Sequence, residues 1–298
     1  MTKTVFIGSA SGWGAQVRET EKGPQVFQNA DFLASFPFSW TWKETLFPLK
    51  PSEELTLPPG ILTLPYIEDI CLRVAHSVEE TLKRDERPVV IGGDHVVAVG
   101  TWAGVTHGLK AKEKFGLIWV DAHMDAHTME TTPSQAYHGM PLAVLLGHGE
   151  PSLVNLLDKG PALRPEHVCL IGVRSYEEGE ENLLKQLGVR IFFMEEVEER
   201  GFEAVFKEAL AIVKKETSGY GLSLDLDAFD PMEAPGVGTP APQGLKQKDV
   251  LPTLVQIKKD PALKAFEIVE YNPDRDKSDK TLYLMRDILL NILPAKGE

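Results

Sequence analysis

The sequence predicts an α/β fold, a doubly wound three-layer sandwich around a mainly parallel, eight-stranded β-sheet. Apolar runs rich in Val, Ile and Phe recur along the 298 residues, and stretches with helical periodicity separate them. Several of these runs lack the polar alternation of a half-exposed strand, as expected when both faces of a sheet are covered. A closed eight-stranded barrel is the alternative that this alternation leaves open.

The predicted elements follow one another as strand, helix, strand. The strands are Val5–Ile7, Ile61–Leu64, Pro88–Ile91, Gly116–Val120, Val168–Val173, Val189–Phe193, Tyr220–Leu226 and Phe266–Val269. The helical stretches include Tyr66–Leu82, Glu180–Leu187, Phe202–Val213 and Val250–Ile257. We expect a single domain over residues 1–298, because proline-rich loops such as 234–242 are too short to link domains.

Composition excludes several classes of partner. The 31 basic and 44 acidic residues give a formal charge of −13, which argues against nucleic acid or an anionic membrane surface as the main partner. No apolar run approaches the roughly 18 to 20 residues of a membrane-spanning helix, and the first residues resemble a strand more than a signal peptide. Cys71 and Cys169 have no metal-type spacing, so we expect both in the core of a cytoplasmic protein.

Three short segments carry metal-binding side chains, and each follows a predicted strand. They are Gly92-Gly93-Asp94-His95, Asp121-Ala122-His123-Met124-Asp125 and Ser223-Leu224-Asp225-Leu226-Asp227. The spacing of Asp121, His123 and Asp125 would place all three on one side of an extended backbone. Since the carboxyl ends of parallel strands meet at one sheet edge, we expect the three segments to converge.

Carboxylates gathered in one pocket repel one another unless cations neutralise them. Two divalent ions would balance the four carboxylates of these segments. The donor set is rich in oxygen and free of sulfur, which favours Mn²⁺ over Zn²⁺. The alternative is that these side chains are surface caps, Asx-turns or a calcium-like structural site.

At these motifs the sequence resembles the ureohydrolases, the family of arginase, agmatinase and formimidoylglutamase. The family's GGDH, DAHxD and SxDxDxxDP segments all occur in order. The resemblance extends to Gly14-Ala15 with Lys22-Gly23-Pro24, to Tyr137-His138-Gly139-Met140-Pro141 and to Glu270-Tyr271-Asn272-Pro273, so it covers essentially the whole chain. It favours the sandwich over the barrel.

The resemblance implies a metal-dependent C–N hydrolase of linear amidines with two Mn²⁺ per subunit. It assigns the first ion to His95, Asp121, Asp125 and Asp225, and the second to His123, Asp121, Asp225 and Asp227. It also implies that Asp125 passes a proton to the leaving nitrogen, that His138 is a general acid or proton shuttle for the product amine and that Glu270 pairs with the guanidinium. A homo-oligomer, a trimer or hexamer, is expected on the same grounds.

Within the family, the substrate-binding stretches are most like those of arginases. Thr132 and Ser134 match positions that bind the α-carboxylate, and Glu177 and Glu180 match acidic positions that face the α-amino group. An acidic helix start favoured by the helix dipole is an equal alternative for the two glutamates. His127, also expected to bind substrate, stands where arginases have Asn, and Ala136 and Ser175 likewise replace Asn and Asp.

We therefore expect hydrolysis of L-arginine to L-ornithine and urea. The alternative within the class is agmatine, formimidoylglutamate or another guanidino or amidino compound. The alternative from a different class is a catalytically silent homologue with a regulatory role.

Overall fold

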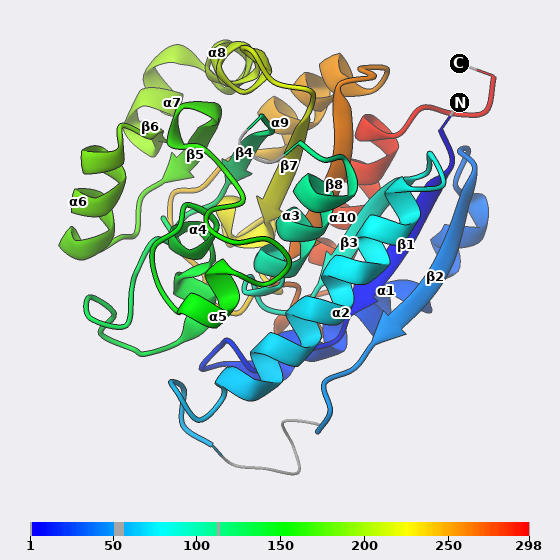
Figure 1. Ribbon diagram of the computed structural model, residues 1–298. Coiled ribbons are helices and arrows are strands. Elements are labelled where there is room, and N and C mark those ends of the chain that lie inside the picture. Colours follow the sequence, from blue (N-terminus) through cyan, green and yellow to red (C-terminus); the bar gives the residue numbers. More distant parts are fainter. Residues whose placement is uncertain (1, 51–56, 112–113, 298) are drawn as a thin grey trace.

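The structure is a computed structural model, and it describes residues 2–50, 57–111 and 114–297 (Figure 1). Its eight strands form one sheet in the order β2-β1-β3-β8-β7-β4-β5-β6. Each pair of neighbouring strands is parallel. Because β2 and β6 lie at opposite edges, the sheet is open, which confirms the predicted sandwich and removes the barrel alternative.

Seven of the eight predicted strands overlap a strand of the structure. The strands are β1 (Thr4–Ser9), β2 (Trp40–Leu46), β3 (Arg87–Gly92), β4 (Gly116–Val120), β5 (Val168–Val173), β6 (Arg190–Phe193), β7 (Tyr220–Asp225) and β8 (Leu263–Val269).

The prediction of a strand at Ile61–Leu64 was wrong. These residues form a turn that leads into helix α2 (Leu64–Leu82), whose first turn contains a proline, as is common at helix starts. Ile61 and Leu62 are more than half exposed, so the apolar run does not signal burial there. The remaining strand is β2 at the sheet edge, which is only partly buried and carries polar residues such as Lys43.

The described part of the chain contains ten α-helices. They are α1 (Gly23–Gln28), α2 (Leu64–Leu82), α3 (Val97–Gly108), α4 (Pro141–Leu145), α5 (Pro151–Val154), α6 (Glu178–Leu187), α7 (Met194–Arg200), α8 (Phe202–Lys214), α9 (Gln247–Leu254) and α10 (Lys280–Ile292). The four predicted helical stretches correspond to α2, α6, α8 and α9, although the last three residues of Val250–Ile257 form a 3₁₀ turn. Every helix in these ranges is too short or too polar to cross a bilayer.

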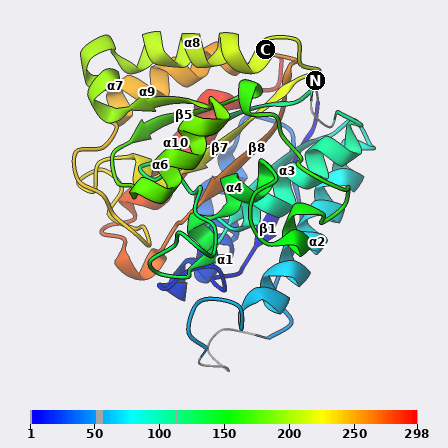
Figure 2. The ribbon, with the colours of Figure 1, turned by 60° about the vertical axis from the view of Figure 1, so that its left-hand side comes forward.

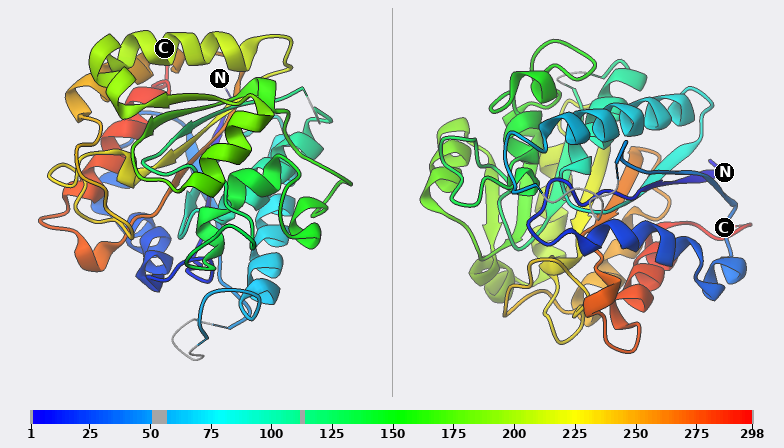
Figure 3. Two further views of the ribbon diagram at one scale, coloured as in Figure 1. Left: turned by 90° about the vertical axis from the view of Figure 1, so that its left-hand side faces the viewer. Right: turned by 90° about the horizontal axis from the view of Figure 1, so that it is seen from below.

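Helices cover both faces of the sheet (Figures 2 and 3). Between the helices and the sheet lie two apolar cores. One core lies between the sheet and α1, α7, α8, α9 and α10. The other lies between the sheet and α2, α3, α4, α5 and α6. Cys71 and Cys169 are both fully buried, one in each core, as predicted.

Helix α3 packs unusually close to α2. A Cβ atom at Gly100 would meet the carbonyl oxygen of Cys71 at 2.4 Å, and one at Gly104 would meet that of Ala75 at 2.4 Å. The two glycines therefore let the helix backbones approach one another. Since α3 begins at Val97, two residues after His95, this packing helps to fix the position of the His95 segment relative to the sheet.

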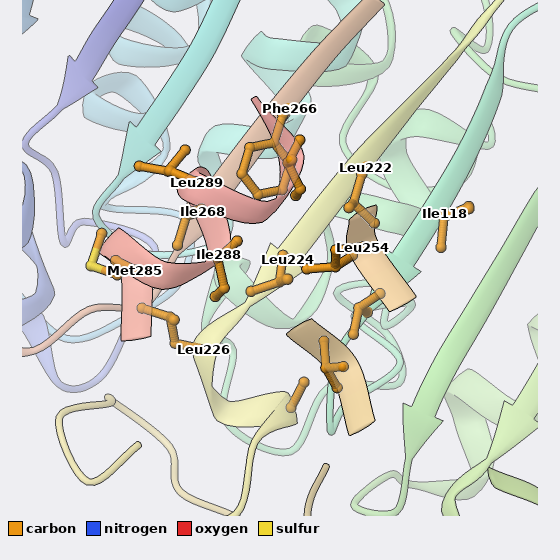
Figure 4. Packing of buried hydrophobic residues seen from close by; sticks show 14 of the residues in the cluster. Ile118, Leu222, Leu224, Leu226, Leu254, Phe266, Ile268, Met285, Ile288 and Leu289 are labelled. Atoms are coloured by element: carbon orange, nitrogen blue, oxygen red, sulfur yellow. The ribbon is translucent and has the colours of Figure 1, made fainter. Parts of the chain in front are cut away.

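From the packing of the core on the α10 side we predict how much stability is lost when one buried side chain is truncated. Leu222 of β7 is fully buried beside Phe266 of β8 and Leu254 of α9 (Figure 4). We expect Leu222→Ala to lower the free energy of unfolding by about 2–5 kcal/mol, because it leaves a cavity. Leu49→Ala, at a position that is 71% exposed, should change it by less than about 0.5 kcal/mol. Urea denaturation followed by tryptophan fluorescence measures both, and equal midpoints would contradict this packing.

Candidate metal centre

The carboxyl ends of five neighbouring strands surround one cavity. The strands are β3, β8, β7, β4 and β5, which are consecutive in the sheet. Seven of the residues that line the cavity carry titratable side chains from the predicted catalytic and metal-binding set: His95, His123, Asp125, His138, Asp225, Asp227 and Glu270. Asp121 is fully buried next to them. The predicted convergence of the three segments is therefore found in the structure.

The first group of donor atoms is centred on His95. Its Nδ1 atom lies 3.1 Å from Asp121 Oδ2, 2.9 Å from Asp125 Oδ2 and 3.1 Å from Asp225 Oδ2. Although Nδ1 is buried, none of these contacts has the geometry of a hydrogen bond. The imidazole is held in place by stacking on the Trp119 indole, with ring centroids 4.1 Å apart. A buried nitrogen that faces three carboxylates without a partner is suited to hold a cation.

A second group of donor atoms lies around His123. Its Nδ1 atom is 3.4 Å from Asp121 Oδ1 and 3.2 Å from Asp227 Oδ2. Asp121 thus directs one oxygen to each histidine, the position expected of a bridging ligand. Asp225 directs Oδ2 to His95, while its Oδ1 accepts a hydrogen bond from the Asp227 backbone N–H at 2.8 Å. The distances therefore do not place an Asp225 oxygen beside the His123 group, where the predicted second bridging ligand would lie.

The spacing of the donors suits a small divalent cation. Two ligands at adjacent corners of an octahedron, each about 2.1 Å from the ion, are about 3.0 Å apart. The contacts of 2.9–3.1 Å around His95 match this separation. Oxygen and imidazole donors with no thiolate agree with the hard divalent ions expected from the sequence.

Charge concentration shifts the pKa values of these groups in the absence of metal. Burial lowers the pKa of His95 and His123, but the facing carboxylates outweigh it and raise both well above 6.5. Burial and neighbouring aspartates raise the pKa of Asp225 well above its ordinary value and that of Asp125 to about 6. The metal-free pocket therefore neutralises itself with protons that a cation would displace.

The backbone after β4 differs from the extended conformation that the i, i+2, i+4 spacing predicted. Residues 121–125 lie outside any strand, and Asp125 has a left-handed conformation with φ of 50°. Glu270, directly after β8, has φ of 66°. Conformations of this kind are costly for residues other than glycine and persist where the surroundings enforce them. They turn both carboxylates into the cavity wall.

Glu270 and His138 form a pair in the cavity wall. Glu270 Oε1 accepts a hydrogen bond from the His95 backbone N–H at 2.9 Å and lies 3.1 Å from His138 Nδ1. Burial lowers the pKa of His138, but the contact with Glu270 raises it to about 9. Glu270 Oε2 is buried without a hydrogen-bond partner. A Cβ atom at Gly238 would lie 2.6 Å from this oxygen, so the glycine keeps the space beside it free.

A loop near the N-terminus, which contains Gly14, holds the backbone of His138 by a hydrogen bond. The His138 backbone N–H donates to the Gly14 carbonyl oxygen at 3.0 Å, and the Gly14 N–H donates to Asp94 Oδ2 at 2.9 Å. A Cβ atom at Gly14 would lie 2.5 Å from the other Asp94 oxygen, which explains the glycine. Asp94, a motif residue not singled out from the sequence, therefore connects the loop to the metal-binding segment.

The predicted substrate-binding residues divide into pocket and supporting positions. His127, Ser134, Glu177 and Glu180 line the cavity, together with Ser175. Thr132 is not among the lining residues described; its hydroxyl lies 3.3 Å from Ser134 Oγ and accepts a hydrogen bond from the Gln135 backbone N–H.

Glu177 and Glu180 also have a structural role. They form a capping box at the start of α6, in which each side chain accepts a hydrogen bond from the other residue's backbone N–H. Glu180 Oε1 additionally accepts a hydrogen bond from the Ala126 N–H. His127 Nε2 lies 2.9 Å from Glu177 Oε2 and 3.3 Å from Glu180 Oε2. The helix-start interpretation of the two glutamates is thus confirmed, and it does not exclude contact with a ligand in the cavity.

Sequence reasoning missed one buried carboxylate behind the cavity. Glu267 of β8 is fully buried and accepts hydrogen bonds from Ser223 Oγ and Trp102 Nε1, each at 2.6 Å. A glutamate among the apolar residues Phe266, Ile268 and Val269 of a central strand was the available signal. It was passed over because the prediction followed only the residues at strand ends.

Comparison with known proteins gives consistent matches over this chain. The model of the Arginase family matches residues 2–294. An arginase of Brevibacillus brevis is 35% identical over 279 residues, which cover 93% of this chain and 92% of the relative. An arginase of Bacillus caldovelox is 44% identical over 209 residues, which cover 70% of this chain and 69% of the relative. The crystal structure of the Bacillus caldovelox arginase superposes with a TM-score of 0.89 at 34% identity and covers 100% of both chains.

The raised pKa values predict how cation binding depends on pH. At pH 7 the metal-free His95 and His123 are protonated, and each must lose its proton to bind an ion. We expect Mn²⁺ binding to release protons and its affinity to rise with pH above 7. Calorimetric titrations at one pH in two buffers of different ionisation enthalpy measure the release. Equal heats in both buffers would contradict the prediction.

The same shifts predict the stability of the metal-free protein. Because the pKa values of both histidines are raised on folding, their pairing with carboxylates stabilises the fold fully below about pH 6.5. This contribution is lost as pH rises through the raised values. The rise in melting temperature on adding Mn²⁺ should therefore be larger at pH 9 than at pH 6.

Proposed function

This chain belongs to the arginase family, and we propose that it hydrolyses L-arginine to L-ornithine and urea with two Mn²⁺ ions per subunit. One observation carries the proposal: the same cavity contains two groups of metal-donor atoms and the buried Glu270 Oε2, which has no hydrogen-bond partner. A cation-binding cluster explains the aspartates, and a cationic substrate explains the free carboxylate oxygen.

The residues divide between the two ions as the resemblance implies. His95, Asp121, Asp125 and Asp225 would hold the first ion, and His123, Asp121, Asp225 and Asp227 would hold the second. The distances support Asp121 as a bridge, whereas the bridge through Asp225 rests on the family alone. When bound, the two ions supply the Lewis acidity that lowers the pKa of water enough to make it a nucleophile near neutral pH.

The protein's own groups bind the substrate and move the protons. Glu270 Oε2 accepts hydrogen bonds from the guanidinium, whose planar set of donors suits a carboxylate. Asp125 takes the proton that the attacking water loses and passes it to the nitrogen that departs as the amine. Water adds to the guanidinium carbon, the bond from that carbon to the substituted nitrogen breaks, and urea and ornithine result.

His138 is protonated near neutral pH because of its contact with Glu270, so it can supply a further proton to the departing amine. The amine then leaves as an ammonium, and the second proton of the attacking water, lost as the C=O bond of urea forms, balances the proton that His138 supplies. The two oxygens of Glu270 therefore have different roles: Oε1 contacts His138, and Oε2 is available to bind the substrate guanidinium.

The amino-acid end of arginine would bind to the polar side chains elsewhere in the cavity wall. Ser134 offers a hydroxyl to the α-carboxylate, with Thr132 beside it. Glu177 faces the α-amino group, while His127 and Glu180 hold Glu177 in place. This pattern favours arginine over agmatine, which has no carboxylate.

Three further expectations belong to this proposal. Residues 1–298 form a single domain, which one sheet running through β1 to β8 supports. The chain works as a cytoplasmic enzyme, and it assembles as a trimer or hexamer.

A substrate panel tests the proposed reaction. Purified protein loaded with Mn²⁺ should release urea from L-arginine with kcat/KM at least about tenfold above that for agmatine, since agmatine lacks the carboxylate that would bind Ser134. A colorimetric urea assay measures this. Faster turnover of agmatine would reject arginine as the substrate, and no urea from any guanidino compound would favour the silent homologue.

Glu270→Gln tests the role of the free carboxylate oxygen. The amide keeps an oxygen for the His95 N–H but removes the charge that faces the guanidinium. We expect kcat/KM for arginine to fall by about 100-fold, the loss of one charged hydrogen bond, at unchanged Mn²⁺ content. Glu178→Gln, at an exposed position on α6, is the control. Full activity of Glu270→Gln would contradict the assignment.

A further inference from the structure

Glu267 is a buried charge that the proposed reaction does not use. It lies in β8, next to β7 and β3 in the centre of the sheet, and its side chain is 0% exposed. Burial raises the pKa of its carboxyl group, and Oε2 has no hydrogen-bond partner. An ionisable group in this position destabilises a fold unless something compensates for it. Packing alone does not explain a glutamate there.

A chain of hydrogen bonds connects Glu267 to the metal-binding segment. Ser223 of β7 is its register partner in the sheet, and Ser223 Oγ lies 2.6 Å from Glu267 Oε1. The same hydroxyl oxygen lies 2.9 Å from His95 Nε2. His95 Nδ1, at the other side of the ring, faces the three aspartates.

The directions of these bonds decide the tautomer of the neutral His95 imidazole. When Glu267 is ionised its carboxylate can only accept, and Ser223 then donates its single hydroxyl proton to Glu267. The Ser223 oxygen must then accept a proton from His95 Nε2–H. In the neutral imidazole this leaves the lone pair on Nδ1, the atom that faces the carboxylates. The Trp102 indole, which can only donate, binds Glu267 Oε1 as well and restricts the carboxylate to this orientation.

We propose that Glu267 is a positioning residue of the metal centre, which acts through Ser223 to hold the Nε2 side of the His95 ring and so to aim Nδ1 at the first ion. Its negative charge behind the ligand also favours cations at that ion's position. The inference rests on the proposed metal centre, but it does not depend on which guanidino compound is the substrate.

Titration of metal-stripped protein with Mn²⁺ alone tests the proposal. We expect wild type to show two binding steps, and Glu267→Gln to weaken one of them by about 10–100-fold. Ser223→Ala should weaken the same step, and the double variant should lose little more than either single variant, because both changes interrupt one chain. Glu79→Gln is the matched control, a mostly buried glutamate on α2 that pairs with Lys83; its affinities should stay within twofold of wild type.

Thermal unfolding separates this role from a merely structural one. If Glu267 acts on the metal centre, Glu267→Gln reduces the rise in melting temperature on adding Mn²⁺ more than it changes the metal-free melting temperature. An equal loss with and without Mn²⁺ would overturn the proposal, as would unchanged Mn²⁺ affinity in either variant. Should Glu267→Gln fail to fold, Ser223→Ala decides alone. Arginine is absent from these measurements, so they stay informative even if the substrate assay fails.

Discussion

The main physical constraint on this structure is the electrostatic repulsion among four buried aspartates, which must be neutralised for the site to be stable. Asp121, Asp125, Asp225 and Asp227 are each less than a tenth exposed, and only two imidazoles lie among their oxygens in the two donor groups. Like charges at this separation cannot all stay ionised without cations. The parallel sheet makes the cluster possible, because consecutive strands deliver their carboxyl ends to one edge. Bound cations would neutralise these carboxylates and remove the repulsion among them.

The sequence predicted the strands that carry the site better than the elements at the margin of the fold. Buried central strands such as Gly116–Val120 are uniformly apolar, and the motif residues follow them directly. The edge strand β2 was missed because Trp40–Leu46 mixes aromatic and charged residues, as a partly exposed strand does. Helix α3 was missed because it is buried all round and has no amphipathic period.

Site residues were predictable where a motif fixed them and not where packing fixed them. The left-handed conformation of Asp125 and the contact of Glu270 with the His95 backbone come from the tertiary structure. Glu267 is separated from His95 by 172 positions in the chain, and no local pattern connects them. The capping box of Glu177 and Glu180 shows the converse, since a short local pattern there was visible and was interpreted in two ways.

Crystals grown with Mn²⁺ and measured with X-rays near the manganese absorption edge give the most direct test of the account. We expect two anomalous peaks about 3.5–4 Å apart, one within bonding distance of His95 Nδ1 and the other of His123 Nδ1, with Asp121 between them. A single peak, or peaks away from these two nitrogen atoms, would contradict the central claim that the aspartates exist to hold a pair of cations.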